Sequence, residues 1–123
     1  LHTIGAAATV DRIIDVFPPH QQQQIRIQLA MVIEGVISQQ LIPTADGKGR
    51  CAAFEVMLAT PAIRAQIREG KTHQIESSIQ TSRNVGMVTM DDCLVEMFRN
   101  GQISKDNALL YAQDQLGMKK NLY

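Results

Sequence analysis

Two arginines and two isoleucines recur at helical spacing in residues 62–69, which read Ala-Ile-Arg-Ala-Gln-Ile-Arg-Glu. Positions four apart lie on one face of a helix, so Arg64 and Arg68 should share one face, and Ile63 and Ile67 another. A guanidinium group keeps its charge and binds carboxylates and phosphates through paired hydrogen bonds. The pattern therefore predicts a helix that is anchored by its isoleucines and presents two cations. The alternative is an amphipathic surface helix whose charged face is only solvated.

One glycine–lysine cluster is present, Asp-Gly-Lys-Gly-Arg at residues 46–50. A phosphate-binding loop needs the spacing GxxxxGK[ST], because its backbone N–H groups and its lysine must surround the phosphates. The cluster lacks that spacing and stands between two predicted strands, where an Asp-Gly pair supplies the positive φ of a tight connection. We therefore interpret it as a turn. His20 and His73 have no partner pattern, and surface positions are expected for both.

Charge, cysteine content and hydropathy exclude several classes of protein. The 12 basic and 12 acidic residues cancel, so no net field draws the chain toward nucleic acid. Cys51 and Cys93 form no CxxC pair and have no nearby histidine ligands, so reduced, buried thiols are favoured over a disulfide or a metal site. No apolar run approaches the roughly 20 residues of a membrane-spanning helix. We predict one globular domain with no nucleic-acid partner, no metal and no direct membrane insertion.

The periodicity of apolar residues predicts the elements that hold these side chains. In the second of two predicted strands both faces carry mainly apolar residues, so we expect a sheet that is covered on both faces. The tail from Gly117 onward is expected to be frayed. Helices are expected over residues 6–16, 21–34, 62–69 and 75–81 and after the capping residues Thr89 and Ser104; strands are expected over 36–42 and 50–58, joined as a hairpin.

Short motifs also follow one another along the chain in a consistent order and spacing. They begin with Leu-His-Thr and occupy residues 1–3, 9–18, 24–30, 35–41, 46–50, 54–57, 60–64, 67–71, 79–81, 86–87 and 89–91. Any one of them would be weak, but collinear matches from Leu1 to about Ala112 are hard to obtain by chance. In these motifs the chain resembles the type IV pilus retraction ATPases of the secretion ATPase superfamily. The resemblance covers nearly the whole chain.

The resemblance implies an α/β fold, namely the carboxy-terminal part of a RecA-like P-loop ATPase core, helix-rich and with a short β-hairpin. Residues 1–60 would form the end of that core, and residues 61–123 a helical carboxy-terminal region. The phosphate-binding loop and an amino-terminal domain are expected to be absent from the chain. Because the sequence starts at Leu1, inside a strand-and-histidine motif, we expect it to be truncated.

The implied activity is that of a hexameric motor ATPase, which couples ATP hydrolysis to pilus retraction and so to twitching motility. The intact protein would use ATP and Mg²⁺, whereas the chain alone is expected to be inactive and to bind neither tightly. Its partners would be further copies of itself in a homo-hexamer and the pilus platform protein of the inner membrane. The resemblance places it in the cytoplasm, peripheral at that membrane.

The resemblance also assigns candidate residues. His2 matches the family's His box near the γ-phosphate, where an imidazole would sense phosphate or tie a strand to a neighbouring helix. Ile4 and Gly5 follow where the family often has Asn-Ser. Residues 62–69 match a motif that the family needs for retraction, with Ala65 and Gln66 in place of Asn and Leu. Coupling or interface roles are assigned to Ala62, Ile63, Arg64, Ile67, Arg68 and Glu69, and weaker subunit contacts to Arg12 and Arg26.

Two other functions stay open at this point. A pilus-assembly or type II secretion ATPase would share the core, but that branch commonly carries a four-cysteine zinc module, and this sequence has only two cysteines. The segment from Arg50 to Lys71 also looks more like the retraction branch. A stand-alone interaction module would explain the missing phosphate-binding loop, but it leaves the histidine motif at the start of the chain unexplained.

Overall fold

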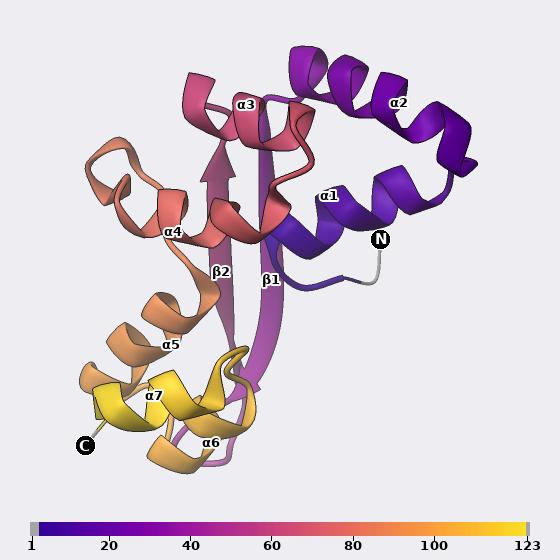
Figure 1. The fold of residues 1–123 in the computed structure, drawn as a ribbon. Helices are drawn as coiled ribbons and strands as arrows, with labels where there is room; N and C mark the ends of the chain where they lie inside the picture. Colours follow the sequence, from indigo (N-terminus) through magenta and orange to yellow (C-terminus); the bar gives the residue numbers. More distant parts are fainter. Residues whose placement is uncertain (1–2, 123) are drawn as a thin grey trace.

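A computed structural model describes residues 3–122. Helices come first along them, two consecutive strands follow, and a series of short helices completes the order (Figure 1). The strands are β1 (Gly35–Pro43) and β2 (Arg50–Leu58). The helices are α1 (Ala6–Asp15), α2 (Pro19–Val32), α3 (Pro61–Arg68), α4 (Ile75–Gln80), α5 (Met90–Arg99), α6 (Lys105–Leu110) and α7 (Gln115–Leu122), with 3-10 turns η1 (Thr72–Gln74) and η2 (Arg83–Val85).

The two strands form the predicted antiparallel hairpin, in which Gly35 pairs with Leu58 at one end and Pro43 with Arg50 at the other. In the turn, Gly47 has φ of 72° and so uses the conformational freedom of glycine. The Asp46 carboxylate accepts hydrogen bonds from the Thr44 hydroxyl at 2.6 Å and the Lys48 N–H at 2.9 Å. These bonds, that from Thr44 foremost, lower the pKa of Asp46. The interpretation of the glycine–lysine cluster as a turn is confirmed.

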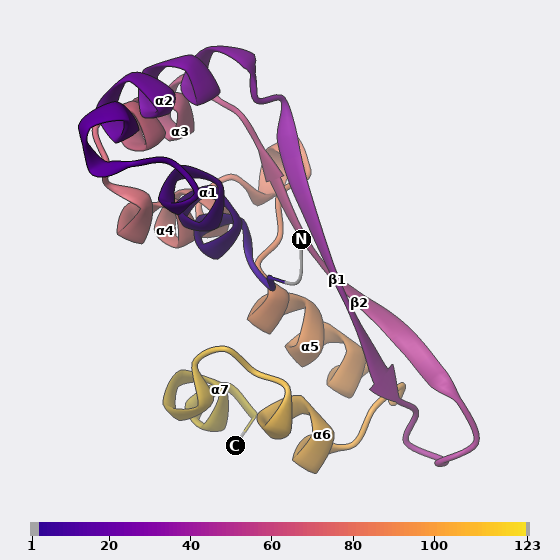
Figure 2. The ribbon, with the colours of Figure 1, turned by 90° about the vertical axis from the view of Figure 1, so that its right-hand side faces the viewer.

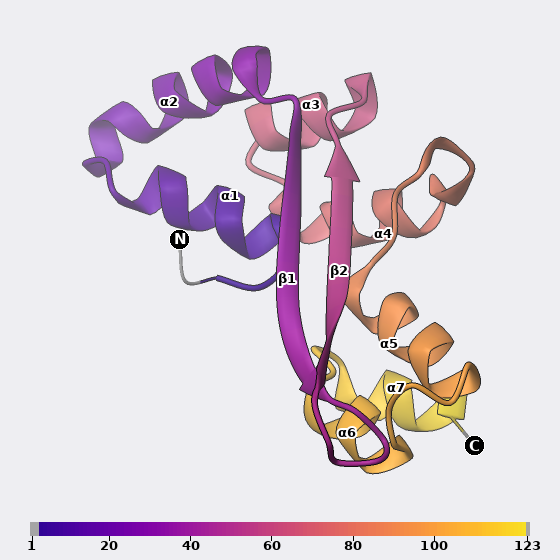
Figure 3. The ribbon, with the colours of Figure 1, turned by 180° about the vertical axis from the view of Figure 1, so that it is seen from behind.

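Only one face of the hairpin is covered by the described residues. Helices α1 and α5 to α7 lie on the same side of the strands (Figure 2), and from behind the strands stand in front of the helices (Figure 3). On the uncovered face the Ile37 side chain is 70% exposed, and Leu41, Phe54 and Leu58 are also exposed. The expectation that both faces would be covered was wrong for residues 3–122. An apolar strand residue indicates that a face can be covered, but it does not supply the covering element.

The hydrophobic core is divided into two clusters that lie at opposite ends of the hairpin. The α1–α4 cluster packs against Met57 in β2, and the α5–α7 cluster packs against Ile42 in β1 and Ala53 in β2. Along the sequence the two clusters meet between Met87 and Met90. The hairpin therefore contributes residues to both clusters. The boundary predicted near residue 60, between the end of the ATPase core and the helical carboxy-terminal region, stays a prediction.

Local signals predicted most of the helices. The Thr89 and Ser104 hydroxyls accept hydrogen bonds from backbone N–H groups three residues on, each at 3.1 Å, and so cap α5 and α6 as expected. Helix α2 begins earlier than predicted, at Pro19, because proline is compatible with the first helical turn. Within residues 3–122, no helix is both long enough and apolar enough to cross a bilayer.

The prediction of a frayed tail was wrong. Residues Gln115–Leu122 form α7, and its Met118 and Leu122 side chains are buried in the α5–α7 cluster, Met118 to 1% exposure. Their spacing of four residues places both on one helical face, while Lys119 and Lys120 stay exposed. Two exposed lysines near the end of a chain suggested disorder, but packing at those two apolar positions holds the helix in place.

Candidate functional site

The segment singled out in the sequence forms α3, and the start of this helix has clear local causes. The Thr60 hydroxyl accepts a hydrogen bond from the Ile63 N–H at 3.4 Å, and Pro61 occupies the first turn. Ile63 and Ile67 are fully buried in the α1–α4 cluster. The prediction that two isoleucines anchor this helix is confirmed. Their burial determines which sides of the helix carry the two arginines.

Arg64 is held inside the protein by backbone carbonyl groups. Its Nη1 donates to the Ala30 oxygen at 2.7 Å, and its Nε donates to the Ala59 oxygen at 3.1 Å. Ala30 lies in the last turn of α2, whose carbonyl groups lack partners within the helix and favour a nearby cation. The Glu34 carboxylate is 3.9 Å from Nη2, but it is largely exposed and adds little. Arg64 therefore joins the end of α2 to the connection between β2 and α3.

Arg68 lies one turn further along α3, in a different environment. The residue is exposed, and among the described residues no hydrogen bond or ion pair holds its guanidinium group. Its backbone oxygen accepts a hydrogen bond from Gln23 Nε2 at 3.2 Å. Glu69, which could have received an arginine, lies 3.7 Å from Lys71 instead. Of the two arginines with helical spacing, the structure uses one internally and leaves the other on the surface.

The departures from the family motif are also placed by the structure. Gln66 Nε2 donates to the Ser78 hydroxyl at 2.7 Å, which links α3 to α4. Its Oε1 is buried and has no hydrogen-bond partner within the described residues. A leucine at this position would leave no polar group to satisfy. Ala62 is exposed and Ala65 is half-buried.

The remaining predicted residues do not join α3 in one site. Arg26 is half-buried and packs over Gly70, the second residue after α3. A Cβ atom added to Gly70 would lie 3.5 Å from the Nε of Arg26. Arg12 is exposed on α1 and, with Asp15 and Val16, lines a shallow hollow. His2 lies outside the described residues. The proposed roles of these residues stay predictions.

A buried carboxylate that sequence reasoning did not select lies on the covered face of β2. Glu55 is 4% exposed, and both of its oxygens accept backbone hydrogen bonds. The sequence did contain a signal for this residue. Glu55 is the one carboxylic acid on the strand face formed by Cys51, Ala53, Glu55 and Met57. A charge on an otherwise apolar, covered face requires compensating partners.

Glu76, on α4, is a second acidic residue in this region. Partial burial raises its pKa, and so do the negative charges of Asp91, Glu55, Asp114 and Asp92. A carboxyl group whose pKa is higher in the folded than in the unfolded chain binds more protons when folded. Stability therefore falls as the pH rises from the unfolded value of 4.5 through the raised folded value, and above that value the ionised group opposes folding.

Glu76→Gln is therefore expected to raise the free energy of unfolding at neutral pH, because the amide removes a charge that is disfavoured there. Below about pH 4 the wild-type group is protonated in both states, and the two proteins should converge in stability. Urea denaturation of both proteins across this pH range is the measurement. Equal differences in stability at every pH would show that the charge of Glu76 has no influence.

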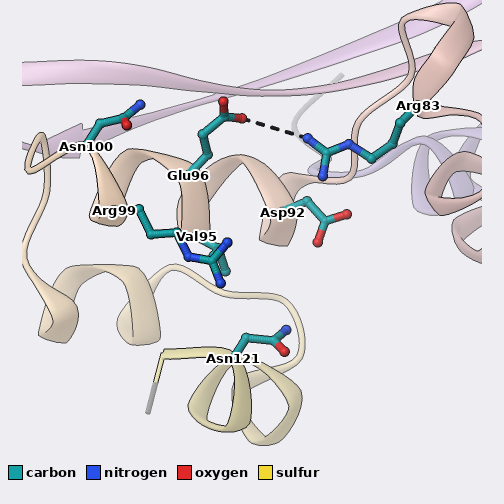
Figure 4. Close-up of a pocket in the computed structure, with 7 residues that line it drawn as sticks. All are labelled: Arg83, Asp92, Val95, Glu96, Arg99, Asn100 and Asn121. Carbon is teal, nitrogen blue, oxygen red and sulfur yellow. Dashed lines mark ion pairs between the residues drawn. The ribbon is translucent and has the colours of Figure 1, made fainter.

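A polar hollow of about 400 Å³ lies beside α5, between η2 and α7 (Figure 4). Two of the residues that line it form an ion pair, with 3.9 Å between Arg83 Nη2 and Glu96 Oε2. Arg99 extends toward the side of α7 that carries Asn121. With Asp92 included, its two cations and two anions balance. None of the predicted site residues that the structure describes lines it, and its charge favours neither an anionic nor a cationic ligand.

The two cysteines lie in β2 and α5. Cys51 and Cys93 do not pair with each other in the structure, and both are half-buried rather than fully buried as expected. Within residues 3–122, no group of three or more His, Cys, Asp or Glu residues is arranged to hold a metal ion.

Comparison with known proteins gives several strong likenesses. No family model matches the sequence. Over 96% of its length the chain is 47% identical to a twitching motility protein of Neisseria gonorrhoeae, of which it covers 32%. Over 88% of its length it is 48% identical to the type IV pilus retraction ATPase PilT of Pseudomonas aeruginosa, of which it covers 31%. The chain thus spans about a third of the length of these relatives.

Comparison of the fold with solved structures also points to pilus retraction and related secretion ATPases. The structure matches a crystal structure of the pilus retraction motor PilT with bound ADP, with a TM-score of 0.85 and 37% identity over 98% of this chain and 33% of that one. It also matches the ATPase DotB of Legionella pneumophila, with a TM-score of 0.71 and 26% identity over 89% of this chain and 30% of that one. The predicted fold class, a helix-rich carboxy-terminal part of a P-loop ATPase with a short hairpin, is confirmed.

Proposed function

We infer that this chain belongs to the type IV pilus retraction ATPases, and we propose that it forms the carboxy-terminal part of such a motor. The observation that carries the proposal is agreement of sequence and fold along nearly the whole chain with proteins named for twitching motility or pilus retraction. The parent protein would hydrolyse ATP and use the released energy to retract the pilus.

The chemistry of phosphoryl transfer would take place largely outside this chain. Phosphoryl transfer needs a loop that surrounds the phosphates, together with groups that hold Mg²⁺. The printed sequence has no GxxxxGK[ST] motif, and the relatives are about three times as long as the chain. We place ATP, Mg²⁺ and that loop in an upstream region of the parent protein, and we expect the chain alone to be inactive. His2 would meet the nucleotide from this side.

The contribution of this chain would be mechanical. Arg64 ties the end of α2 to the start of α3 through hydrogen bonds to the Ala30 and Ala59 carbonyl oxygens. Helices α2 and α3 should therefore move together as a rigid pair when the parent protein changes state. Arg68 stands on the outer surface of that pair and would contact either a neighbouring subunit of a homo-hexamer or the pilus platform protein at the inner membrane.

The experiment that tests this function uses the full-length gene product and a strain that lacks the gene. We expect the purified protein to hydrolyse ATP, and we expect the mutant strain to lose twitching while pili accumulate on its surface. Surface pili are counted by electron microscopy. A mutant without pili would identify an assembly ATPase instead, and a full-length protein without ATPase activity would contradict the proposal altogether.

A further inference from the structure

Two guanidinium groups near the carboxyl end of α3 have no partner in the part of the chain that the structure describes. Arg68 lies in the last turn of α3 and is exposed. Arg26 lies in α2 and is half-buried, and its Nε would be 3.5 Å from a Cβ atom added to Gly70. Within residues 3–122, no hydrogen bond or ion pair holds either guanidinium group. Both charges therefore stay open to a second molecule.

Contacts between α2 and α3 bring the two arginines to the same end of this helix pair. Arg64 donates to the Ala30 oxygen near the end of α2, whereas the Arg68 oxygen accepts a hydrogen bond from Gln23, in the first half of α2. The two helices therefore pack antiparallel. Arg68 follows Arg64 by four residues, and Arg26 follows Gln23 by three, so each arginine shares a helical face with a residue that bridges the two helices. The arginines consequently flank the same stretch of the boundary between α2 and α3.

The carboxyl end of α3 does not need these cations as hydrogen-bond donors. The backbone N–H groups of residues 69–71 donate to the oxygens of residues 65–67, at distances between 2.8 and 3.2 Å. The remaining terminal oxygen, that of Arg68, accepts from Gln23 Nε2 at 3.2 Å. All four terminal carbonyl groups of the helix are thus occupied. The end of α2 differs, because there Arg64 itself supplies a donor.

The acidic side chains beside this end of α3 have other partners. Glu69 Oε2 is 3.7 Å from Lys71 Nζ, and the Asp11 carboxylate accepts a hydrogen bond from the Thr72 hydroxyl at 2.7 Å. Among the described residues, no carboxylate forms an ion pair with either of the two arginines. Like charges that share a surface repel each other, and two carboxylates from outside would relieve that repulsion. Within residues 3–122, the cations of an ionic contact are therefore present here without its anions.

We propose that Arg26 and Arg68, the arginine pair, form a docking surface for an acidic segment of a partner protein. The inference rests on the proposed function, because it names the chemistry of the protein that the outer surface of α3 contacts. A guanidinium group can bind a carboxylate through two parallel hydrogen bonds, so the pair fits a segment that carries two carboxylates. An anionic membrane fits less well, because the exposed Glu69 carboxylate beside the pair would repel it and the chain has no net charge.

The first test is a titration of the chain with a helical peptide in which two glutamates stand four residues apart. The NMR signals of the Nε–H groups of Arg26 and Arg68 should shift, whereas that of Arg64, whose Nε and Nη1 already have acceptors, should not. Arg50, an exposed arginine at the turn end of the hairpin, is the matched control for unspecific attraction. Arg68→Ala should weaken binding of the peptide by about fivefold, which is the effect of losing one exposed ion pair.

The same titration can overturn the inference. Unchanged signals of the arginine pair, or an equal shift of the Arg50 signal, would do so. An equal response to a control peptide with two glutamines in place of the glutamates would show that carboxylates are not recognised. Binding to vesicles of phosphatidylglycerol without binding to the peptide would identify a membrane contact instead. If the inference is correct, binding of the peptide weakens as salt is raised from about 0.05 M to about 0.5 M, because exposed charges are screened.

The second test uses the full-length protein in cells. Charge reversal by Arg26→Glu together with Arg68→Glu should slow pilus retraction by about tenfold or more, because the surface would then repel an acidic segment. Arg50→Glu should leave the speed unchanged. Retraction at the wild-type speed in the double variant would overturn the inference. A wild-type protein without ATPase activity would instead contradict the proposed function, and the peptide titration would still decide whether the arginine pair binds carboxylates.

Discussion

Arg64→Ala is expected to lower the free energy of unfolding of the chain by about 2–3 kcal/mol. Hydrogen bonds from a charged donor contribute about 1.5–3 kcal/mol each when buried, and Arg64 makes two of them with its side chain 26% exposed. Removal of the guanidinium group also leaves the Ala30 carbonyl group at the end of α2 without a charged partner. Urea denaturation of wild type and variant gives the difference directly.

The matched control is Arg68→Ala, four residues along the same helix. Because no described residue binds its guanidinium group, the free energy of unfolding should change by less than about 0.5 kcal/mol. Arg64→Lys should fall between the two, because an ammonium group keeps the charge but cannot reproduce the planar pair of bonds. Equal losses of stability in Arg64→Ala and Arg68→Ala would contradict the different environments that the structure gives these two residues.

Met118→Ala is expected to lower the free energy of unfolding by about 2–4 kcal/mol, because it empties a fully enclosed position in the α5–α7 cluster. The control lies in the same helix. Leu116 is 79% exposed, and Leu116→Ala should change stability by less than about 0.5 kcal/mol. Urea denaturation again measures both. If neither variant differed from wild type, the tail would be frayed after all, and α7 would not be part of the core.

The elements that could be predicted from the sequence are those with local causes. The hairpin follows from two alternating stretches around an Asp-Gly turn, and α5 and α6 follow from Thr89 and Ser104, whose caps involve residues only three positions away. The order of α7 depends instead on contacts with other segments, because Met118 and Leu122 are buried in the α5–α7 cluster and α7 packs against α5 and α6. A short helix near the end of a chain has no local signal strong enough to outweigh two lysines.

The candidate site shows the same limit. The sequence correctly predicted that Ile63 and Ile67 anchor α3, because periodicity identifies a buried face. It could not separate Arg64 from Arg68, since the partners of Arg64 are the backbone carbonyl groups of Ala30 and Ala59. Any residue type provides a carbonyl oxygen, so such a partner leaves no mark in the sequence. Glu55 did leave one, as a charge among apolar strand residues, but its hydrogen bonds to the starts of α1 and α5 could be seen only in three dimensions.

The family resemblance came from collinear motifs, and the relatives and the matching fold confirm it. The residue roles that came with it need their own tests. The Nε and Nη1 atoms of Arg64 both have internal partners, whereas the guanidinium group of Arg68 is exposed and available to a second protein. The structure therefore divides the motif into a part that holds α2 and α3 together and a part that faces outward.

We propose that, in the parent protein, the outer surface of α3 transmits the work of ATP hydrolysis to retraction. The direct measurement is the speed of pilus retraction in cells whose full-length protein carries Arg68→Ala, together with the ATPase rate of the purified variant. We expect an ATPase rate within about twofold of wild type and retraction slowed by about tenfold or more, because only the outward contact is lost. Retraction at the wild-type speed would contradict the claim.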